Sequence, residues 1–223
     1  MFGLVLFNDW SCRDIQKWEY HPLGPFLGKN MLSTISPWIV PIEAFEPFRL
    51  KTAQMECISA GVAEEPLPYI RHEPNAKLGF NIGLQWGIQT STMSEPEFIS
   101  HTNLKYMWWS WAQMITHHTS NGCNLRPGDL LASGTISGSD SYSYDPNKYE
   151  PGAERDSYGS LIEISWGGKK EINLKNGEVR KFLQDGDKVV MRGKCDNGEV
   201  DFGFGDCTAG LLPAVPLPEY IKE

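Results

Sequence analysis

Residues 80–90 alternate between apolar side chains and polar side chains or glycine, and this pattern constrains the fold more than any other segment. Side chains of a β-strand point alternately to its two faces, so a period of two predicts a strand with one packed face and one wet face. The packed face is predicted to carry Phe80, Ile82, Leu84, Trp86 and Ile88.

Further short apolar segments predict strands, and most of them lie after residue 129. Asn-Gly and Asp-Gly pairs at 176–177, 185–186 and 197–198 punctuate the C-terminal part, as is typical of hairpin turns. A helix is expected over Asn103–His118 and a short one over Ser11–Trp18. We therefore expect an α+β fold that is mostly β, with residues 1–223 forming one domain. The strands are predicted at Gly3–Asn8, Leu130–Ile136, Ser160–Trp166, Lys188–Arg192 and Val200–Phe204.

Charge and cysteine content narrow the class of protein. Twenty Lys and Arg against 28 Asp and Glu give a formal net charge of -8, which repels nucleic-acid phosphates and anionic lipid surfaces. Five widely spaced cysteines form neither a disulfide framework nor a zinc motif, as expected for a reducing compartment. The apolar run Leu4–Phe7 is too short for a signal peptide or a membrane span. We expect a cytoplasmic protein that binds neither nucleic acid nor membranes.

Chemically versatile side chains are concentrated between residues 9 and 29, where a strand end, a short helix and a rigid loop follow one another. The group consists of Asp9, Arg13, Gln16, Tyr20 and Lys29. Functional groups are often placed on strand ends and shaped loops, and residues three apart share one helix face. The sequence therefore leaves two roles open for Asp9. It is either a metal ligand or a helix N-cap beside an ordinary surface salt bridge.

Two later positions are also candidates. Glu163 interrupts an apolar strand, where a buried carboxylate needs a partner; the alternative is a solvent-facing glutamate. Thr135 lies in the segment Gly134–Gly138, which predicts a backbone and hydroxyl contact at a strand end. His117 and His118 are expected either to interact favourably with the C-terminal dipole of their helix or to be packed histidines, without a catalytic role.

Three long motifs give the chain a family resemblance. They are Asn8–Tyr20 continued by Pro22–Lys29, then His117–Gly138, and finally Gly203–Gly205. Together they resemble the fumarylacetoacetase family, and the segment Trp18–Lys29 resembles fumarylacetoacetase itself more than the wider superfamily of acylpyruvases and oxaloacetate-processing enzymes. The resemblance implies a mixed β-sandwich roll that assembles as a homodimer.

The resemblance also implies a reaction and a metal. The family hydrolyses a carbon–carbon bond of a β-diketo acid, releasing fumarate and acetoacetate, with Mg²⁺ or Ca²⁺ at the site. Asp9 is implied as a metal ligand, and Lys29 and Ser33 as parts of the cation site. A single carboxylate is a weak site for cations that take six or more oxygens, so Asp9 alone is expected to bind metal poorly.

Roles in binding and catalysis follow from the same resemblance. Gln16, Tyr20 and Thr135 are implied to contact the substrate. Arg13, Gln16 and Lys29 are implied to stabilise the negative charge that develops as the bond breaks.

Other family positions do not appear in this sequence. Glu163 is implied to orient a water-activating histidine, but that histidine and three further carboxylate ligands belong upstream of Gly3 in the family pattern. The segment Ser137–Gly159 is predicted to be a mobile surface loop, and its part Ser139–Tyr158 is longer than in the family. Three alternatives therefore stand: a part of the complete enzyme, a short inactive remnant that dimerises or binds metal, and a superfamily keto-acid decarboxylase or tautomerase.

Overall fold

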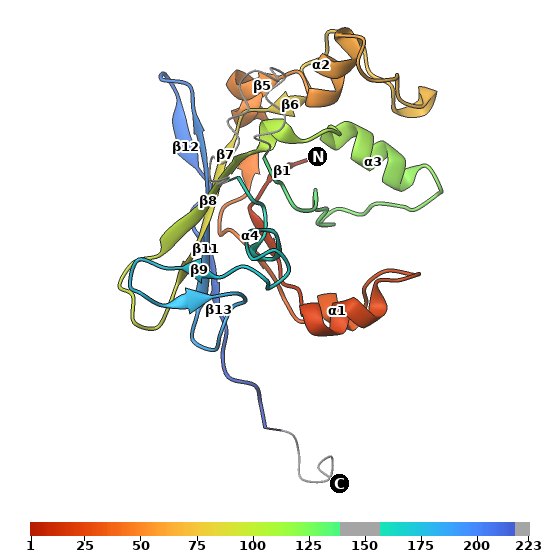
Figure 1. Ribbon diagram of the computed structural model, residues 1–223. Helices are drawn as coiled ribbons and strands as arrows, with labels where there is room; N and C mark the ends of the chain where they lie inside the picture. Colours follow the sequence, from red (N-terminus) through yellow and green to blue (C-terminus); the bar gives the residue numbers. More distant parts are fainter. Residues whose placement is uncertain (139–156, 217–223) are drawn as a thin grey trace.

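A five-stranded antiparallel sheet forms the centre of the molecule (Figure 1). The computed structural model describes residues 1–138 and 157–216. Strand β11 pairs with β7 along one edge and with both β12 and β13 along the other, and β8 extends the sheet beyond β7. The strands are β7 (Gly83–Gln89), β8 (Glu97–Asn103), β11 (Lys188–Asp196), β12 (Asp201–Gly203) and β13 (Cys207–Gly210).

The alternating segment forms the middle of this sheet, which confirms the main part of the first prediction. Trp86 and Ile88 are buried on β7, and Met191 of β11 lies directly opposite Trp86. The strand is shorter than expected, because residues 79–80 form a separate strand β6 (Gly79–Phe80). Strand β6 pairs with β5 (Arg49–Leu50) outside the central sheet.

Four short strand pairs lie outside the central sheet in the part of the chain that the structure describes. The Asn176-Gly177 turn joins β9 to β10, and Gly177 has a φ of 87°, a left-handed conformation that glycine adopts without strain. This confirms the hairpin prediction, as does the Asn197-Gly198 turn between β11 and β12. The short pairs are β1 (Gly3–Leu4) with β4 (Val40–Pro41), β2 (Phe7–Asp9) with β3 (Ser33–Ile35), β5 with β6, and β9 (Ile172–Asn173) with β10 (Val179–Arg180).

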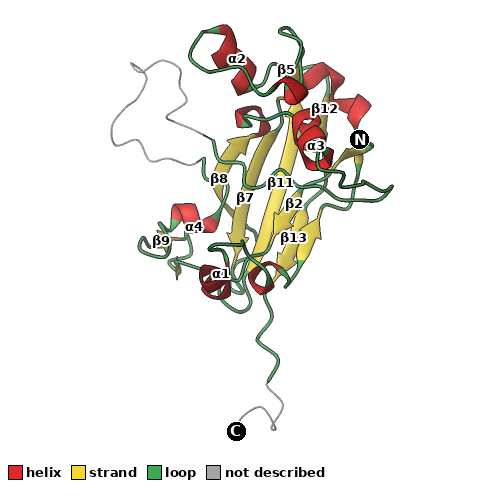
Figure 2. Ribbon diagram, turned by 90° about the vertical axis from the view of Figure 1, so that its right-hand side faces the viewer, coloured by secondary structure: helices red, strands yellow, loops and turns green. Residues whose placement is uncertain are grey.

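The α-helices lie on the same side of the central sheet (Figure 1). Helices α2 and α3 lie near one end of the strands and α1 lies near the other end (Figure 2). The structure confirms the short N-terminal helix as α1. The helices are α1 (Arg13–Glu19), α2 (Ala53–Ser59), α3 (Trp111–Thr119) and α4 (Leu161–Ile164), with 3₁₀ turns η1 (Leu27–Lys29), η2 (Ile42–Phe48), η3 (Pro68–Ile70) and η4 (Leu104–Tyr106).

The helix expected over residues 103–118 is shorter than predicted. Its first part is the 3₁₀ turn η4, and α3 begins only after Ser110. Ser110 accepts a hydrogen bond from the Gln113 backbone, and the Gln113 side chain accepts one from the Ser110 backbone, which forms a capping box. This reciprocal cap fixes the start of the helix.

We expect replacement of Ser110 by Ala to lower the free energy of unfolding by about 1–2 kcal/mol, because the cap of α3 is lost. The Ser110 hydroxyl also lies 2.7 Å from Nε2 of His72. Urea unfolding measures the change, with Ser91→Ala at an exposed serine as the control. Equal stability of the two variants would show that this cap does not stabilise the helix.

Two of the predicted strands, over residues 160–166 and 130–136, are wrong. Residues 161–164 form the helical turn α4, in which Leu161 and Ile164 both pack against the core cluster that contains Trp86 and Ile88. A spacing of three places two side chains on the same face of a helix but on opposite faces of a strand. Residues 130–136 form no strand, and Leu130 and Leu131 are exposed. The surface loop predicted over residues 137–159 lies mostly outside the described residues.

Phenylalanine side chains fill the larger of two core clusters. The ring of Phe45 is fully buried and lies 5.4 to 5.9 Å, centroid to centroid, from three other phenylalanine rings. Offset and edge-to-face contacts of this kind add stability beyond the burial of area. Because Leu6 belongs to the same cluster, this core supports the segment between β1 and β2. The three rings are those of Phe80, Phe202 and Phe204.

All five cysteines are free thiols in the structure. Burial raises the pKa of the Cys195 thiol to about 12 and also raises the pKa of Cys207, so both remain protonated at neutral pH. Within the described residues, no helix is both long enough and apolar enough to cross a membrane.

Candidate functional site

Asp9 and Ser33 are brought together by the β2–β3 pair. They are direct partners in the antiparallel register and lie at the end of these two strands. Partners of this kind have Cβ atoms only about 4.5–5.5 Å apart. The structure therefore places two of the predicted cation-site residues side by side.

Lys29 reaches the same place from the 3₁₀ turn η1. Its Nζ lies 2.6 Å from Oδ2 of Asp9 and 2.6 Å from the hydroxyl oxygen of Ser11. Ser11 in turn donates a hydrogen bond to the backbone carbonyl of Asp9 at 3.0 Å. The ammonium group is therefore held between two side chains, with 28% of the Lys29 side chain exposed.

The alternative role of Asp9 as a helix N-cap is wrong. The N-cap of α1 is Cys12, which makes no side-chain capping bond. The Asp9 carboxylate is instead paired with Lys29, so the salt-bridge part of that alternative is present in the structure.

Arg13 and Gln16 lie on one face of α1, as their spacing predicts. Nη1 of Arg13 donates to Oε1 of Gln16 at 2.9 Å. Nε of Arg13 is buried and has no hydrogen-bond partner among the described residues. Because a buried donor without a partner is unfavourable, this N–H is suited to a ligand that supplies an acceptor. Tyr20 follows directly at the end of α1, and its side chain is exposed.

Glu163 lies on α4 and is surrounded by hydroxyl groups. The Ser137 hydroxyl lies 2.7 Å and 2.9 Å from the two carboxylate oxygens, and the Ser160 hydroxyl donates to Oε2 at 2.8 Å. The Ser160 contact spans three residues, which a helical turn permits. The carboxylate is therefore partly buried and held by hydrogen bonds, which is the paired arrangement expected for a functional glutamate rather than a freely solvated one.

Thr135 lines a cavity of about 200 Å³ between the segment that follows α3 and the segment between η4 and α3. Ser137, the partner of Glu163, lines the same cavity. One wall is therefore rich in hydroxyl groups and the other is aromatic. The lining consists of Tyr106, Met107, Trp108, Trp109, Met114, Ser133, Thr135, Ile136 and Ser137.

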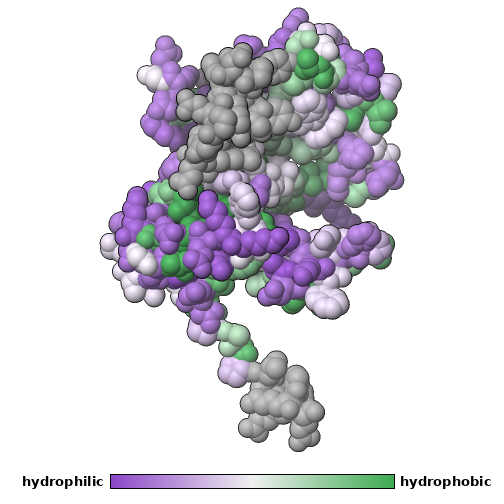
Figure 3. Space-filling model, viewed as in Figure 1, coloured by the Kyte–Doolittle hydropathy of each residue, from purple (hydrophilic) through white to green (hydrophobic). Residues whose placement is uncertain are grey.

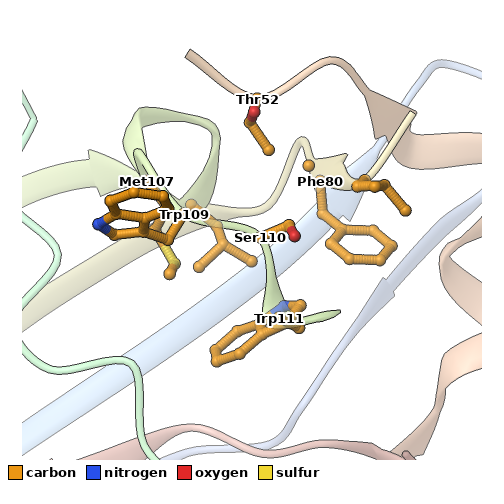
Figure 4. Close-up of a pocket in the computed structure, with 9 residues that line it drawn as sticks. Thr52, Phe80, Met107, Trp109, Ser110 and Trp111 are labelled. Carbon is orange, nitrogen blue, oxygen red and sulfur yellow. The ribbon is translucent and has the colours of Figure 1, made fainter. Parts of the chain in front are cut away.

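A second pocket lies close to this cavity but is much smaller. Its volume is about 10 Å³, which is enough for one water molecule at most. Met107 and Trp109 line both spaces, and the small pocket also touches Thr52, Phe80 and Ser110 (Figure 4). The larger cavity is therefore the better place for a substrate.

The predicted site residues form two groups. The first comes from the continuous segment between β2 and β3, and the second from the segments beside the larger cavity, where Ser137 binds Glu163. The first contains Asp9, Arg13, Gln16, Tyr20, Lys29 and Ser33, and the second contains Thr135 and Glu163. Within residues 1–138 and 157–216, no recorded hydrogen bond or ion pair joins the groups. The surface is hollowed between the part that carries α3 and the part that carries α1 (Figure 3).

Sequence reasoning did not identify three serines that contact the site residues. Ser11 holds Lys29, and Ser137 and Ser160 hold Glu163. The position of Ser11, two residues after Asp9, and that of Ser160, three residues before Glu163, were available as signals. The contact of Ser137 with Glu163 had no comparable signal, because the two residues are 26 positions apart.

The described residues do not fit a divalent cation by themselves. They contain no cluster of three or more His, Cys, Asp or Glu side chains able to hold a metal. Asp9 offers one carboxylate, and the ammonium of Lys29 already lies against one of its oxygens. A protonated lysine has no free electron pair, so Lys29 contributes a countercharge beside Asp9 and does not itself coordinate a metal.

Comparison with known proteins shows to which proteins the chain is related. Residues 1–210 match the family described as Fumarylacetoacetate (FAA) hydrolase C-terminal. Fumarylacetoacetase of Homo sapiens is 47% identical over 216 residues, which cover 96% of this chain and 46% of the human protein. The corresponding enzyme of Dictyostelium discoideum is 46% identical, with 96% and 45% covered, and that of Arabidopsis thaliana is 43% identical, with 97% and 46% covered. The chain spans about half the length of these curated relatives. It belongs to the fumarylacetoacetate hydrolase family and corresponds to the C-terminal part of its members.

Proposed function

We propose that the protein containing this chain hydrolyses 4-fumarylacetoacetate to fumarate and acetoacetate, the last step of tyrosine and phenylalanine breakdown. The observation that carries this proposal is the fixed Lys29 ammonium, held by Asp9 and Ser11. Lys29 follows the hydrogen-bonded pair Arg13 and Gln16 in the sequence. The chain that carries these residues is 47% identical to human fumarylacetoacetase.

The reaction needs hydrogen-bond donors for negative charge. Water adds to a ketone carbon of the substrate, the adjacent carbon–carbon bond breaks, and its electron pair leaves with the acetoacetate part as an enolate, which then takes up a proton. Lys29 and the unpartnered Nε of Arg13 supply donors to these developing oxyanions. Donors fixed in advance are effective because they need no reorganisation as the charge forms. The Gln16 side chain binds the substrate beside them.

Glu163 acts through another group. Its carboxylate is held by Ser137 and Ser160, so it can fix the orientation of an imidazole N–H that reaches it. An oriented imidazole is an effective general base for water. Thr135 and Tyr20 contact the substrate, and Thr135 lines the cavity of about 200 Å³.

The metal is part of this proposal only through Asp9. We propose that Mg²⁺ or Ca²⁺ binds when further oxygen ligands complete the site, with Asp9 as one ligand beside Ser33. These cations take six to eight oxygens, more than the described residues provide here. When bound, the metal would supply positive charge for the substrate's oxygens.

Fold type, assembly and location complete the proposal. We propose a mixed β-sandwich roll that forms a homodimer in the cytoplasm. The support for a partner is that large apolar side chains in α1 and in the chain that follows it are exposed, since exposed apolar surface commonly marks interfaces. Trp18 is 88% exposed, Leu23 82% and Trp38 67%.

We expect the protein that contains this chain to consume fumarylacetoacetate when Mg²⁺ or Ca²⁺ is supplied, and we expect Asp9→Ala to lower kcat at least about 100-fold. Loss of the diketone absorbance measures turnover. Asp14→Ala, at an exposed aspartate of α1, is the control. Equal turnover in the two variants, or turnover of oxaloacetate instead, would contradict the proposal.

A further inference from the structure

Glu19, the last residue of α1, accepts three backbone hydrogen bonds from the segment 26–28. Its Oε2 accepts from the N–H groups of Phe26 and Gly28, both at 2.9 Å, and its Oε1 accepts from the N–H of Leu27 at 3.1 Å. These bonds, from Gly28, Phe26 and Leu27, lower the pKa of Glu19, so the carboxylate is ionised at neutral pH. One side chain therefore binds three consecutive peptide groups directly before Lys29.

Two further features fix the same segment on α1. The carbonyl of Gly28 accepts a hydrogen bond from the Cys12 N–H at 2.8 Å, at the beginning of the helix. A Cβ atom at Gly28 would lie 2.8 Å from Cβ and 2.9 Å from Cα of Gln16, so only glycine permits this close approach. The segment is thus attached to the N-terminal end, the middle and the C-terminal end of α1.

The consequence concerns Lys29, whose backbone directly follows Gly28. Lysine has a long and flexible side chain, and the position of its backbone decides whether Nζ reaches both Asp9 and Ser11. Asp9 and Ser11 precede α1, whereas Lys29 follows the loop. The hydrogen bonds between Glu19, at the end of α1, and segment 26–28 therefore keep the backbone of Lys29 near Asp9 and Ser11.

We propose that Glu19 is a positioning residue whose carboxylate fixes segment 26–28 on α1 and thereby sets the place of the Lys29 ammonium beside Asp9 and Ser11. Glu19 itself has no role toward the substrate. The catalytic consequence rests on the proposed function, whereas the placement of Lys29 does not.

The first test measures the accessibility of Lys29 in the full chain. An amine-acylating reagent is added at a low level, and mass spectrometry compares labelling of Lys29 with that of the exposed Lys17 in the same sample. We expect Glu19→Ala to raise relative labelling of Lys29 about threefold or more, since its ammonium is no longer held by two partners. Glu19→Gln keeps one acceptor oxygen and should give a smaller rise. Glu64→Ala, at an exposed glutamate, is the matched control. Unchanged labelling in Glu19→Ala would overturn the proposal.

The second test is a double-mutant cycle on turnover of fumarylacetoacetate. We expect Glu19→Ala to lower kcat about tenfold or more, but to lower it less than about twofold when Lys29 is already Met, because a residue that acts through Lys29 has nothing left to position. Equal losses in both backgrounds would mean a general structural role and would overturn the proposal. If the unmodified protein does not turn over the diketone, the proposed function fails, and the labelling result still decides whether Glu19 positions Lys29.

Discussion

Lys29→Met is expected to lower kcat for fumarylacetoacetate hydrolysis by about 10²- to 10³-fold, the size of effect seen when one fixed donor to a developing oxyanion is removed. The side chain of Met has a similar length but carries no charge and no donor. Asp9 and Ser11 would both lose the ammonium that lies 2.6 Å from each of them. Steady-state kinetics on the protein that contains this chain measures the effect.

Lys17→Met is the control for this substitution. Lys17 is an exposed residue of α1. Its replacement by Met removes the same positive charge at a position outside the group around Asp9. We expect its kcat to stay within about twofold of the unmodified protein. A similar loss in both variants would indicate that net charge, and not the fixed donor, controls the reaction.

Asp187→Ala is expected to lower the free energy of unfolding by about 3–5 kcal/mol, because it leaves a buried arginine without its main partner. Nε and Nη2 of Arg180 lie 2.7 Å and 2.9 Å from the two oxygens of Asp187, and the side chains are only 7% and 1% exposed. Asp187 also accepts the backbone N–H of Gln184 at 2.9 Å, at the turn before β11. Urea unfolding monitored by circular dichroism measures the loss.

The matched control is a second arginine–aspartate pair with similar distances but far greater exposure. Arg192 and Asp206 lie 2.8 Å apart with their side chains 43% and 47% exposed. We expect Asp206→Ala to cost no more than about 1 kcal/mol, because water already solvates both charges. If the two aspartate variants were equally stable, burial would not be what makes the Arg180–Asp187 pair important.

A neighbouring carboxylate extends this buried pair toward β7. Glu178 lies 2.6 Å from Nη2 of Arg180 and also accepts hydrogen bonds from Thr90 and Thr92, which follow β7. Hydrogen bonds from Thr92, Arg180 and Thr90 lower the pKa of Glu178 to about 2. The network therefore connects the β9–β10 hairpin to the end of β7 by charge and hydrogen bonding.

Local patterns predicted the elements whose determinants lie close together in the sequence. The alternation of residues 80–90 predicted a strand, of which residues 83–89 form β7, and Asn176-Gly177 predicted a hairpin. The spacing of Arg13 and Gln16 predicted a shared helix face, since a helix brings residues three apart together whatever surrounds it. Helix α3 was predicted too long because the Ser110 cap makes it start at Trp111, and periodicity does not reveal this cap.

Residue types and motifs also indicated the family and the residues around Asp9, but not how these residues contact one another. The sequence by itself determined that Asp9, Arg13, Gln16 and Lys29 occur within 21 positions, on a strand end, a helix and a rigid loop. Short-range hydrogen bonds and side-chain spacing are enough to specify such elements.

Only the tertiary structure decided which partners the charged groups have. The turn at 161–164 is helical because Leu161 and Ile164 pack on the same core cluster, and Ser137 meets Glu163 across 26 positions. Burial likewise makes Arg180 and Asp187 a structural pair, whereas Arg192 and Asp206 remain solvated. The physical reason is that burial and long-range packing depend on every element at once, and they override the weak local preference of an apolar segment for a strand.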